Sequence, residues 1–347
     1  MNIKKIAISF VMLGLVAIAC FSYYIYSIML VSNTAFNGKE AFIFISTGAS
    51  YQEVRSDLEP LLKDIEKFDI LAQQKKYTTN VKPGRYRITN GMTNNDIINS
   101  IRSQNIPIKI TFNNQHSLEV LANRISNQIE PDSLSLIQAF TDEEFLKDHG
   151  FTYQTALAMY MPNSYEFFWN TSPEKFRAKM LKSYRNFWNI KRQDKAKNIG
   201  LSPTEVSILA AIVQEESKQK SEQKRVAGVY VNRLKNGWPL QADPTLKFAA
   251  YKLPEYKNKT IKRVLNKHKA IKSPYNTYLY KGLPPGLIAM PDLVAIDAVL
   301  NYEQHKFFYF AADRNRPGFH KFAESLSDHN KNARSYHNFL NENGIKN

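Results

Sequence analysis

An uncharged stretch near the N-terminus constrains this chain more than any other feature. Residues 6–31 contain no charged side chain. As a helix rising about 1.5 Å per residue, they are long enough to cross a hydrocarbon layer of roughly 30 Å. Two lysines directly precede the stretch, and the next charged residue is Lys39. Because Lys and Arg favour the cytoplasmic side, we expect a single span with residues 1–5 in the cytoplasm and the remainder outside it.

Two alternatives to a permanent anchor are open. A cleaved signal peptide has an apolar region of roughly 7–15 residues and a small-residue cleavage site. Residues 17–20 (AIAC) resemble a lipoprotein processing site, with lipidation at Cys20. However, apolar sequence continues beyond Cys20 as far as Val31, which favours an uncleaved anchor. Cys20 is the only cysteine, so a disulfide within the chain and a cysteine-based zinc site are both excluded.

Length and charge limit what the exported part does. The 347 residues are enough for roughly two domains of about 100–200 residues each, and 43% hydrophobic residues suffice for a folded core. The 47 Lys and Arg against 31 Asp and Glu give a net charge of +16, which favours nucleic acid, acidic lipid or an acidic polymer as partner. A generally basic composition accounts for the charge equally well. Export removes most nucleic-acid roles, so we expect no nucleic-acid partner.

Short strand and helix patterns alternate after the polar linker at 33–40. The sequence predicts strands at 41–45, 86–88 and 107–112, with helices beginning at Ser50, Ile65 and Thr93. These elements predict a small α+β module over residues 40–112. From Ser117 onward helical spacing dominates. The fold class expected is therefore α+β, with an N-terminal transmembrane helix, a small module and a larger, mainly helical domain at 113–347.

A strong helix start precedes the most informative segment. Ser202 is a capping residue, Pro203 suits the first turn, and Glu205 is placed to complete a capping box. The helix is then mostly apolar over 206–213 and ends in Gln-Glu-Glu-Ser at 214–217.

Periodicity separates the two glutamates at this end. Glu216 follows Val213, Ile212 and Leu209 by three, four and seven residues, so it continues their apolar stripe. Glu215 is turned about 100° away. Desolvation on the stripe raises the pKa of a carboxyl group, as a general acid requires. Two structural roles for Glu216 stay open beside this one: it marks where the helix emerges into solvent, or it pairs with a nearby cation.

Four blocks in order resemble one known family, the YceG-like (MltG) endolytic murein transglycosylases. The blocks are residues 212–217 (IVQEES) with 226–234 (VAGVYVNRL), 237–245 (GWPLQADPT), 273–278 (SPYNTY) with 282–286 (GLPPG), and 309–312 (YFAA) with 320–322 (HKF) and 328–330 (DHN). The resemblance covers most of the chain. This sequence departs from it with Gln214 where many relatives carry an acid and Trp238 where many carry Met.

The resemblance implies a function and a set of roles. Residues 40–112 would form a LysM-like module and 113–347 the catalytic domain, although Phe44 and Tyr86 fit a core as well as a glycan surface. Glu216 falls on the family's essential glutamate. The implied reaction cleaves peptidoglycan glycan strands to 1,6-anhydroMurNAc ends without metal or cofactor. The implied setting is the cytoplasmic (inner) membrane, with residues 6–31 in the lipid bilayer and peptidoglycan synthases as partners in terminating growing strands.

One carboxyl group suffices for such a reaction, because no water has to be activated. We expect Glu216 to act first as acid and then as base. Our candidates for holding the saccharide are Gln241, Asp243, Tyr275 and Asn276, whose amide, carboxylate and phenol groups match sugar hydroxyl and N-acetyl groups. Each has an alternative: Asp243 as a cap, Asn276 as a brace for loop backbone, Tyr275 as a packed ring. Asn232 and Arg233 are expected to brace the helix that carries Glu216.

Competing classes of function are open as well. A lysozyme-type muramidase would need a second carboxylate, for which Asp243 or Glu222 would serve. A wall-binding scaffold would need no catalysis, and charge alone suggests a DNA- or RNA-binding protein. We expect no metal site, because the seven histidines show no His-Glu-x-x-His spacing. His320 and His329 are predicted to lie in a loop region.

Overall fold

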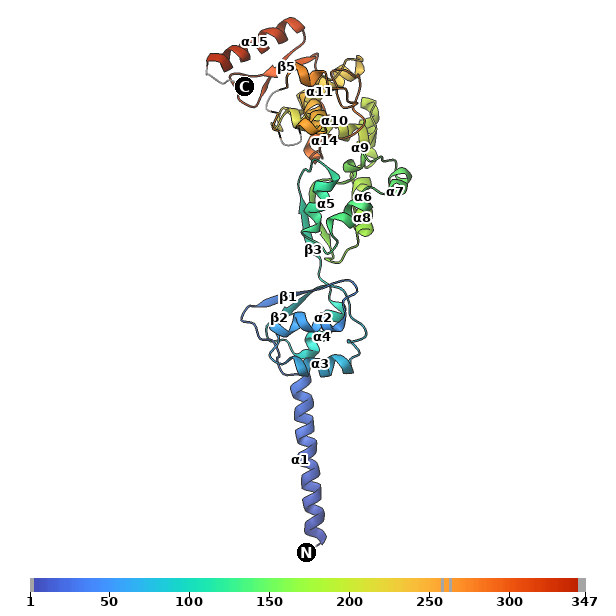
Figure 1. Ribbon diagram of the computed structural model, residues 1–347, viewed down its shortest axis with the longest axis vertical. Helices are drawn as coiled ribbons and strands as arrows, with labels where there is room; N and C mark the ends of the chain where they lie inside the picture. Colours follow the sequence, from blue (N-terminus) through green and yellow to red (C-terminus); the bar gives the residue numbers. More distant parts are fainter. Residues whose placement is uncertain (1–2, 257–258, 262–263, 343–347) are drawn as a thin grey trace. The chain divides into compact units, whose positions relative to one another are not determined.

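The chain forms two compact units (Figure 1). The computed structural model describes residues 3–256, 259–261 and 264–342, so the outermost parts of the predicted segments 1–5 and 113–347 lie outside it. One unit, here the anchored unit, comprises Met1–Ile110, Gln128–Pro131 and Tyr165–Ser172. The other, here the helical unit, comprises Thr111–Asn127, Asp132–Ser164 and Pro173–Asn347.

Residues 6–29 of the predicted span 6–31 lie in one helix, α1 (Ile3–Met29), and Leu30 and Val31 follow its end. It is long and apolar enough to cross a membrane, with a mean hydropathy of 2.3 over its most apolar window. Its last turn enters the core of the anchored unit: Ile28 is only 3% exposed, and the Asn94 side-chain amide donates to the Ile28 carbonyl at 2.8 Å. The C-terminal end of the anchor is therefore part of the folded unit, while Cys20 is exposed.

The anchored unit combines a two-stranded antiparallel sheet with short helices. Strand β1 (Glu40–Ile45) pairs antiparallel with β2 (Gly84–Thr89), placing Ile43 opposite Tyr86. The helices are α2 (Tyr51–Leu58), α3 (Ile65–Gln74) and α4 (Asn94–Ser103), with the short 3-10 turn η1 (Glu59–Leu61). In Figure 1, α3 lies beside the end of α1. These elements confirm the predicted ones, including the helix starts capped at Ser50 and Thr93.

Two later segments return to the anchored unit, and the sequence did not indicate them. Glu130 accepts a hydrogen bond from the Thr47 hydroxyl at 2.8 Å, and its amide donates to the Trp169 carbonyl. Trp169 packs edge-on against Phe44 with ring centroids 5.2 Å apart. Phe44 remains 44% exposed, whereas Tyr86 is a core residue. Long-range pairing of this kind leaves no periodic trace in a sequence.

The helical unit consists mainly of helices with one short sheet, in which β5 (Tyr309–Ala312) pairs antiparallel with β6 (His320–Ala323). Strand β3 (Ile108–Phe112) pairs with β4 (Asn163–Phe167), and the residues of both strands are divided between the two units. The helices are α5 (Leu118–Ser126), α6 (Ser133–Phe140), α7 (Glu143–Asp148), η2 (Ala156–Met159), α8 (Pro173–Phe187), α9 (Ile190–Ile199), α10 (Pro203–Glu216), α11 (Gln223–Lys235), α12 (Asp243–Tyr251), η3 (Pro254–Tyr256), α13 (Asn266–Lys269), α14 (Leu293–Leu300) and α15 (Leu326–Glu342).

Helix α10 forms the centre of this unit. It begins as predicted, with a capping box between Ser202 and Glu205 and Pro203 in the first turn. It packs against α11, α12 and α14. Every residue from Val206 to Gln214 is buried, so the helix is enclosed on all sides rather than along one stripe. The apolar-stripe description was therefore too narrow, because three neighbouring helices surround it.

The prediction for the two C-terminal histidines was wrong. His320 begins β6, and His329 lies in α15. Polar residues are frequent around both, and Pro317-Gly318 precedes His320, which made the segment look like a loop. In the structure Tyr309 stacks on His329 with ring centroids 5.3 Å apart, so tertiary packing supplies the order that local pattern did not.

Candidate functional site

Glu216 is the last residue of α10, and the helix ends there because Ser217 is extended, at φ −128° and ψ 118°. The Ser217 hydroxyl binds the Glu222 carboxylate at 3.2 Å, which fixes the turn that leads into α11. Glu216 is partly exposed, unlike the nine residues from Val206 to Gln214. A buried helix therefore ends in two partly exposed acidic residues, Glu215 and Glu216.

The surroundings of Glu216 favour its protonated form. The Tyr230 hydroxyl of α11 donates to its Oε1 at 2.9 Å. Burial, followed by the negative charge of Asp243, raises the pKa of Glu216 to about 7, although the Tyr230 hydrogen bond, His320 and the backbone amide of Asp243 act in the opposite direction. The direction agrees with the sequence-based expectation. Among the described residues no ion pair involves Glu216; a phenol donates to it, and Asp243, His320 and Arg233 interact with it through their charges.

Asp243 begins α12 and has a phenol partner of its own. The Tyr278 hydroxyl donates to Asp243 Oδ1 at 2.7 Å. Burial raises the pKa of both Tyr230 and Tyr278, so both phenols remain protonated donors. The sequence analysis missed both tyrosines. They lie within blocks that carry the family resemblance, but no periodic rule places Tyr230 against a carboxylate fourteen residues earlier.

Glu222, the other candidate for a second carboxylate, is occupied. It is buried, and it accepts hydrogen bonds from the His320 backbone amide at 2.9 Å and from His320 Nδ1 at 2.7 Å. Burial pushes the pKa of Glu222 upward, but the hydrogen bonds from His320 and Ser217 outweigh it and hold the pKa below its usual value. Glu222 thus ties the start of α11 to β6.

Gln241 has an unusual backbone conformation. Its φ of 50° lies in the left-handed region, which is uncommon for a residue other than glycine and costs on the order of 1–3 kcal/mol. Its backbone N–H donates to the Thr277 carbonyl at 2.9 Å, and its side chain is exposed. The strained backbone leaves the side-chain amide of Gln241 exposed to solvent, two residues before Asp243.

The other two saccharide candidates differ from each other. Tyr275 is 7% exposed and packs on Phe248 with ring centroids 4.7 Å apart, at the edge of a cavity of about 350 Å³. Asn276 is fully buried; its amide donates to the carbonyls of Lys269 and Ile271, and its oxygen accepts from the Tyr278 amide. The structure therefore favours the loop-bracing alternative for Asn276, because its side chain has no free polar atom to offer a sugar.

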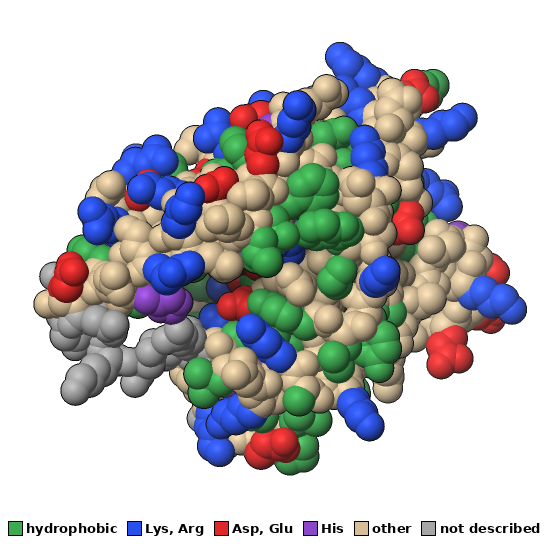
Figure 2. Space-filling model, turned by 90° about the horizontal axis from the view of Figure 1, so that it is seen from above, with side chains coloured by type: hydrophobic (Ala, Val, Ile, Leu, Met, Phe, Trp, Pro, Cys, Tyr) green, Lys and Arg blue, Asp and Glu red, His purple; other side chains and the backbone are tan. Residues whose placement is uncertain are grey.

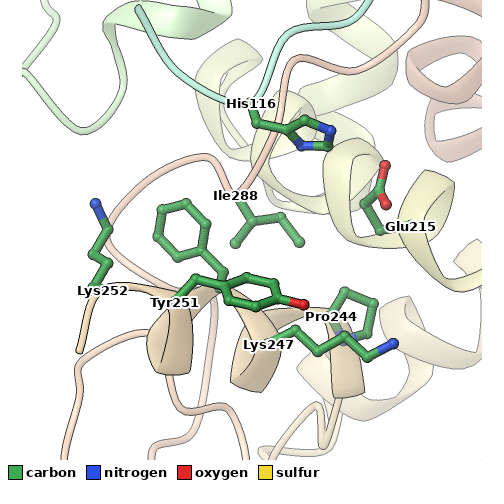
Figure 3. Close-up of a pocket in the computed structure, with 8 residues that line it drawn as sticks. His116, Glu215, Pro244, Lys247, Tyr251, Lys252 and Ile288 are labelled. Atoms are coloured by element: carbon green, nitrogen blue, oxygen red, sulfur yellow. The ribbon is translucent and has the colours of Figure 1, made fainter. Parts of the chain in front are cut away.

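A cavity of about 490 Å³ is lined by Glu215 and Pro244, the chain neighbours of Glu216 and Asp243 (Figure 3). Helix α12 forms one side, and His116 and Glu215 lie across from it. Glu215, not Glu216, lines this cavity, and it pairs with Lys218 at 2.8 Å. Its lining residues are His116, Glu215, Pro244, Lys247, Phe248, Tyr251, Lys252 and Ile288.

A family model for YceG-like proteins matches residues 43–335, which is most of the chain. The chain belongs to the YceG-like family. A relative from Bacillus subtilis, named endolytic murein transglycosylase, is 28% identical over 83% of this chain and 84% of its own length. A protein of the same name from Streptococcus pneumoniae is 26% identical over 97% of this chain, which spans 66% of that longer protein.

A solved structure confirms the fold of this YceG-like chain. A YceG-like protein from Listeria monocytogenes, determined at 2.6 Å, superposes with a TM-score of 0.55 over 84% of this chain and 98% of its own. At 24% sequence identity, that likeness concerns the fold alone.

Two residues of the YceG-like blocks brace a different segment from the one expected. The Asn232 amide donates to the carbonyls of His305 and Phe307, and Arg233 Nε donates to the Phe308 carbonyl at 2.8 Å. They therefore hold the segment that leads into β5 against α11, and not α10 itself. Trp238 packs on Phe308 with ring centroids 4.9 Å apart and is 39% exposed.

The prediction that this YceG-like chain needs no metal stays a prediction. Within residues 3–256, 259–261 and 264–342, no three His, Cys, Asp or Glu side chains cluster in a way that would hold an ion. What the site offers is one carboxyl group that titrates near neutrality, a phenol bound to it and a second acid nearby.

Proposed function

We propose that this chain is a membrane-anchored lytic transglycosylase that cleaves peptidoglycan glycan strands, with Glu216 as both acid and base. The observation that carries the proposal is the pKa of Glu216, raised to about 7 by burial and by Asp243. A group with such a pKa gives up and takes back a proton with little penalty near neutral pH. The names of the Bacillus and Streptococcus relatives support the reaction class.

The steps follow from one carboxyl group. Protonated Glu216 gives its proton to the glycosidic oxygen as that bond breaks. The sugar's own N-acetyl group stabilises the positive charge at the anomeric carbon. Ionised Glu216 then removes the proton of the C6 hydroxyl, which closes the 1,6-anhydro ring. Tyr230 holds the carboxyl group in place through its 2.9 Å hydrogen bond.

Neighbouring residues have supporting roles in this proposal. Asp243 keeps the pKa of Glu216 high through its negative charge. Gln241 and Tyr275 remain our candidates for saccharide contact, Gln241 because it is exposed beside the acid. Residues 40–112 and 113–347 are retained as the LysM-like module and the catalytic domain.

A muramidase is the second candidate, and Asp243 is the observation that favours it. Its charge raises the pKa of Glu216, so a second carboxylate lies in the neighbourhood of the proposed acid, as a muramidase requires. Glu222 is less suited, because His320 and Ser217 already bind it.

Analysis of products from a chemically defined glycan tests the proposal. Anhydro ends formed by the purified protein support lytic cleavage, reducing ends would mean hydrolysis, and glycan binding without cleavage would mean a scaffold.

The setting of the proposed reaction is the outer face of the cytoplasmic membrane. Helix α1 suits an anchor, and the two lysines before it favour an N-terminus on the inside. The net charge of +16, visible as Lys and Arg side chains spread over the face in Figure 2, suits an anionic wall polymer or lipid surface. An anchored enzyme would meet strands while synthases extend them, and so would limit their length. Longer strands in cells carrying only Glu216→Gln would support this role.

A further inference from the structure

Two residues that line the 490 Å³ cavity are the chain neighbours of the proposed acid, Glu216, and of Asp243. Glu215 lines it from α10 and Pro244 from α12, next to Glu216 and Asp243 respectively. The mechanism above uses neither of these lining residues. A group attached to the sugar at the cleavage point would therefore reach this cavity without occupying the position of the reacting atoms.

The chemistry of the cavity comes mostly from one face of α12. Pro244, Lys247, Phe248, Tyr251 and Lys252 follow helical spacing, so they share that face. Figure 3 shows the two lysines on either side of the aromatic rings. The Lys252 ammonium lies 4.7 Å from the centre of the Phe248 ring. Among the described residues, neither lysine forms an ion pair with a carboxylate.

A second cavity continues the first. The cavity of about 350 Å³ shares His116, Phe248 and Lys252 with it, and runs on to Tyr153 and Glu119. The Tyr153 hydroxyl donates to Glu119 at 2.8 Å. The two cavities thus offer two lysines and aromatic rings, with the Glu119 carboxylate in the second cavity, where the charge of Lys252 helps to lower its pKa.

We infer that these joined cavities hold the peptide branch of the substrate, with Lys247 and Lys252 binding its carboxylates. The amino sugars of a glycan strand carry no net charge once their lactyl groups are amide-linked, so two unpaired cations do not match the strand itself. The peptide branches carry carboxylates, and their small apolar side chains suit the rings of Phe248 and Tyr251. This inference rests on the proposed function, because it assumes a peptide-bearing glycan at Glu216.

Two substrates and two variants test the inference. Glycan strands with intact peptides are compared with the same strands after an amidase has removed the peptides and the freed lactyl carboxylates have been converted to methylamides, so that the bare strands carry no charge. The variant Lys247→Gln/Lys252→Gln is expected to raise KM at least tenfold on the peptide-bearing strands, since a loss of about 1.4 kcal/mol over the two charge-assisted contacts corresponds to a factor of ten. Its kinetics on the bare strands should equal those of the native protein. Lys224→Gln, an exposed lysine on α11, is the matched control and should change neither.

Each other outcome is decisive. An equal loss on both substrates would assign the cavity to the glycan and overturn the inference, and so would no loss on either. Glu216→Gln should abolish cleavage of both kinds of strand. If the native protein cut neither, the proposed function would fail; direct binding of a fluorescent acidic stem peptide, weakened about tenfold by the double lysine variant and not by Lys224→Gln, would then still support the cavity assignment, and unchanged binding would refute it.

Discussion

Three features of its surroundings determine the pKa of Glu216. It ends a buried helix, accepts a hydrogen bond from Tyr230 at 2.9 Å and lies near the charge of Asp243. The sequence predicted that its pKa would be raised, but it assigned the cause to a stripe on one helix. In the structure the cause is shared among residues of three helices, and only the identity of Glu216 was available from local pattern.

The pH dependence of cleavage follows from these contacts. Since Glu216 must begin protonated, kcat/KM should fall about tenfold per pH unit above pH 7. Asp243→Asn removes a charge that raises the pKa, so the falling limb should move to lower pH. Tyr230→Phe removes a hydrogen bond that lowers it, so that limb should move to higher pH. Rates measured from pH 5 to 9 with a defined glycan check all three, and abolished cleavage by Asp243→Asn would instead favour a muramidase.

The raised pKa also predicts a stability effect. The folded protein binds the Glu216 proton more tightly than the unfolded chain, whose carboxyl group has its ordinary pKa of 4.5. Stability is therefore lost as pH rises from about 4.5 to 7, and the loss is complete above that range. Glu216→Gln lacks this penalty and should be more stable than the native protein by about 1–3 kcal/mol at pH 8, and by almost nothing at pH 4.

Urea unfolding of both proteins at the two pH values measures the difference. An equal difference at pH 4 and pH 8 would show that the carboxyl group is not destabilised by its surroundings.

At the level of helices and strands, the sequence predicted correctly those features that depend on interactions between residues close together in the chain. The helix starts at Ser50, Thr93 and Ser202 were predicted correctly because each side chain satisfies amide groups of its own first turn, and the capping box predicted at Ser202 is present. The return of residues 128–131 and 165–172 to the anchored unit was not, because it depends on contacts such as Glu130 with Thr47. Tyr275 and Asn276 are adjacent in sequence, and only the fold distinguishes the cavity residue from the buried brace.

The contact of α11 with the segment after α14 depends on one glycine. A Cβ atom on Gly228 would lie 2.3 Å from the Glu303 carbonyl oxygen and 2.6 Å from His305 Nε2. Gly228→Ala should therefore force the two elements apart and reduce the free energy of unfolding by about 1–3 kcal/mol. Gly38→Ala is the control, since its nearest neighbour would be at an ordinary 3.6 Å. Equal melting temperatures for Gly228→Ala and the native protein would contradict this close packing.

For the molecule as a whole, the last turn of α1 belongs to the core of the anchored unit. Ile28 is buried in the core of that unit, and Asn94 binds its carbonyl. The hydrophobic run alone predicted a span, but not that its last turn is also a structural part of the unit that follows it. That dual role could not be predicted because Ile28 is as apolar as the residues that face lipid.

Truncation separates the two roles of α1. A chain that starts at Tyr26 should be released from the membrane and keep the stability of the anchored unit. A chain that starts at Ser32 also loses Ile28, and the unit should be destabilised by about 1.5–3 kcal/mol, the value of burying one such side chain. Thermal unfolding of the two soluble forms makes the comparison, and identical transitions would show that Ile28 adds nothing.

The central claim concerns one carboxyl group, and mass spectrometry of digested sacculi tests it most directly. The native protein is expected to yield fragments that end in 1,6-anhydroMurNAc, and Glu216→Gln, with its fold verified by circular dichroism, is expected to yield none. Anhydro products formed by Glu216→Gln at the native rate would contradict the account, because Glu216 would then be neither the acid nor the base.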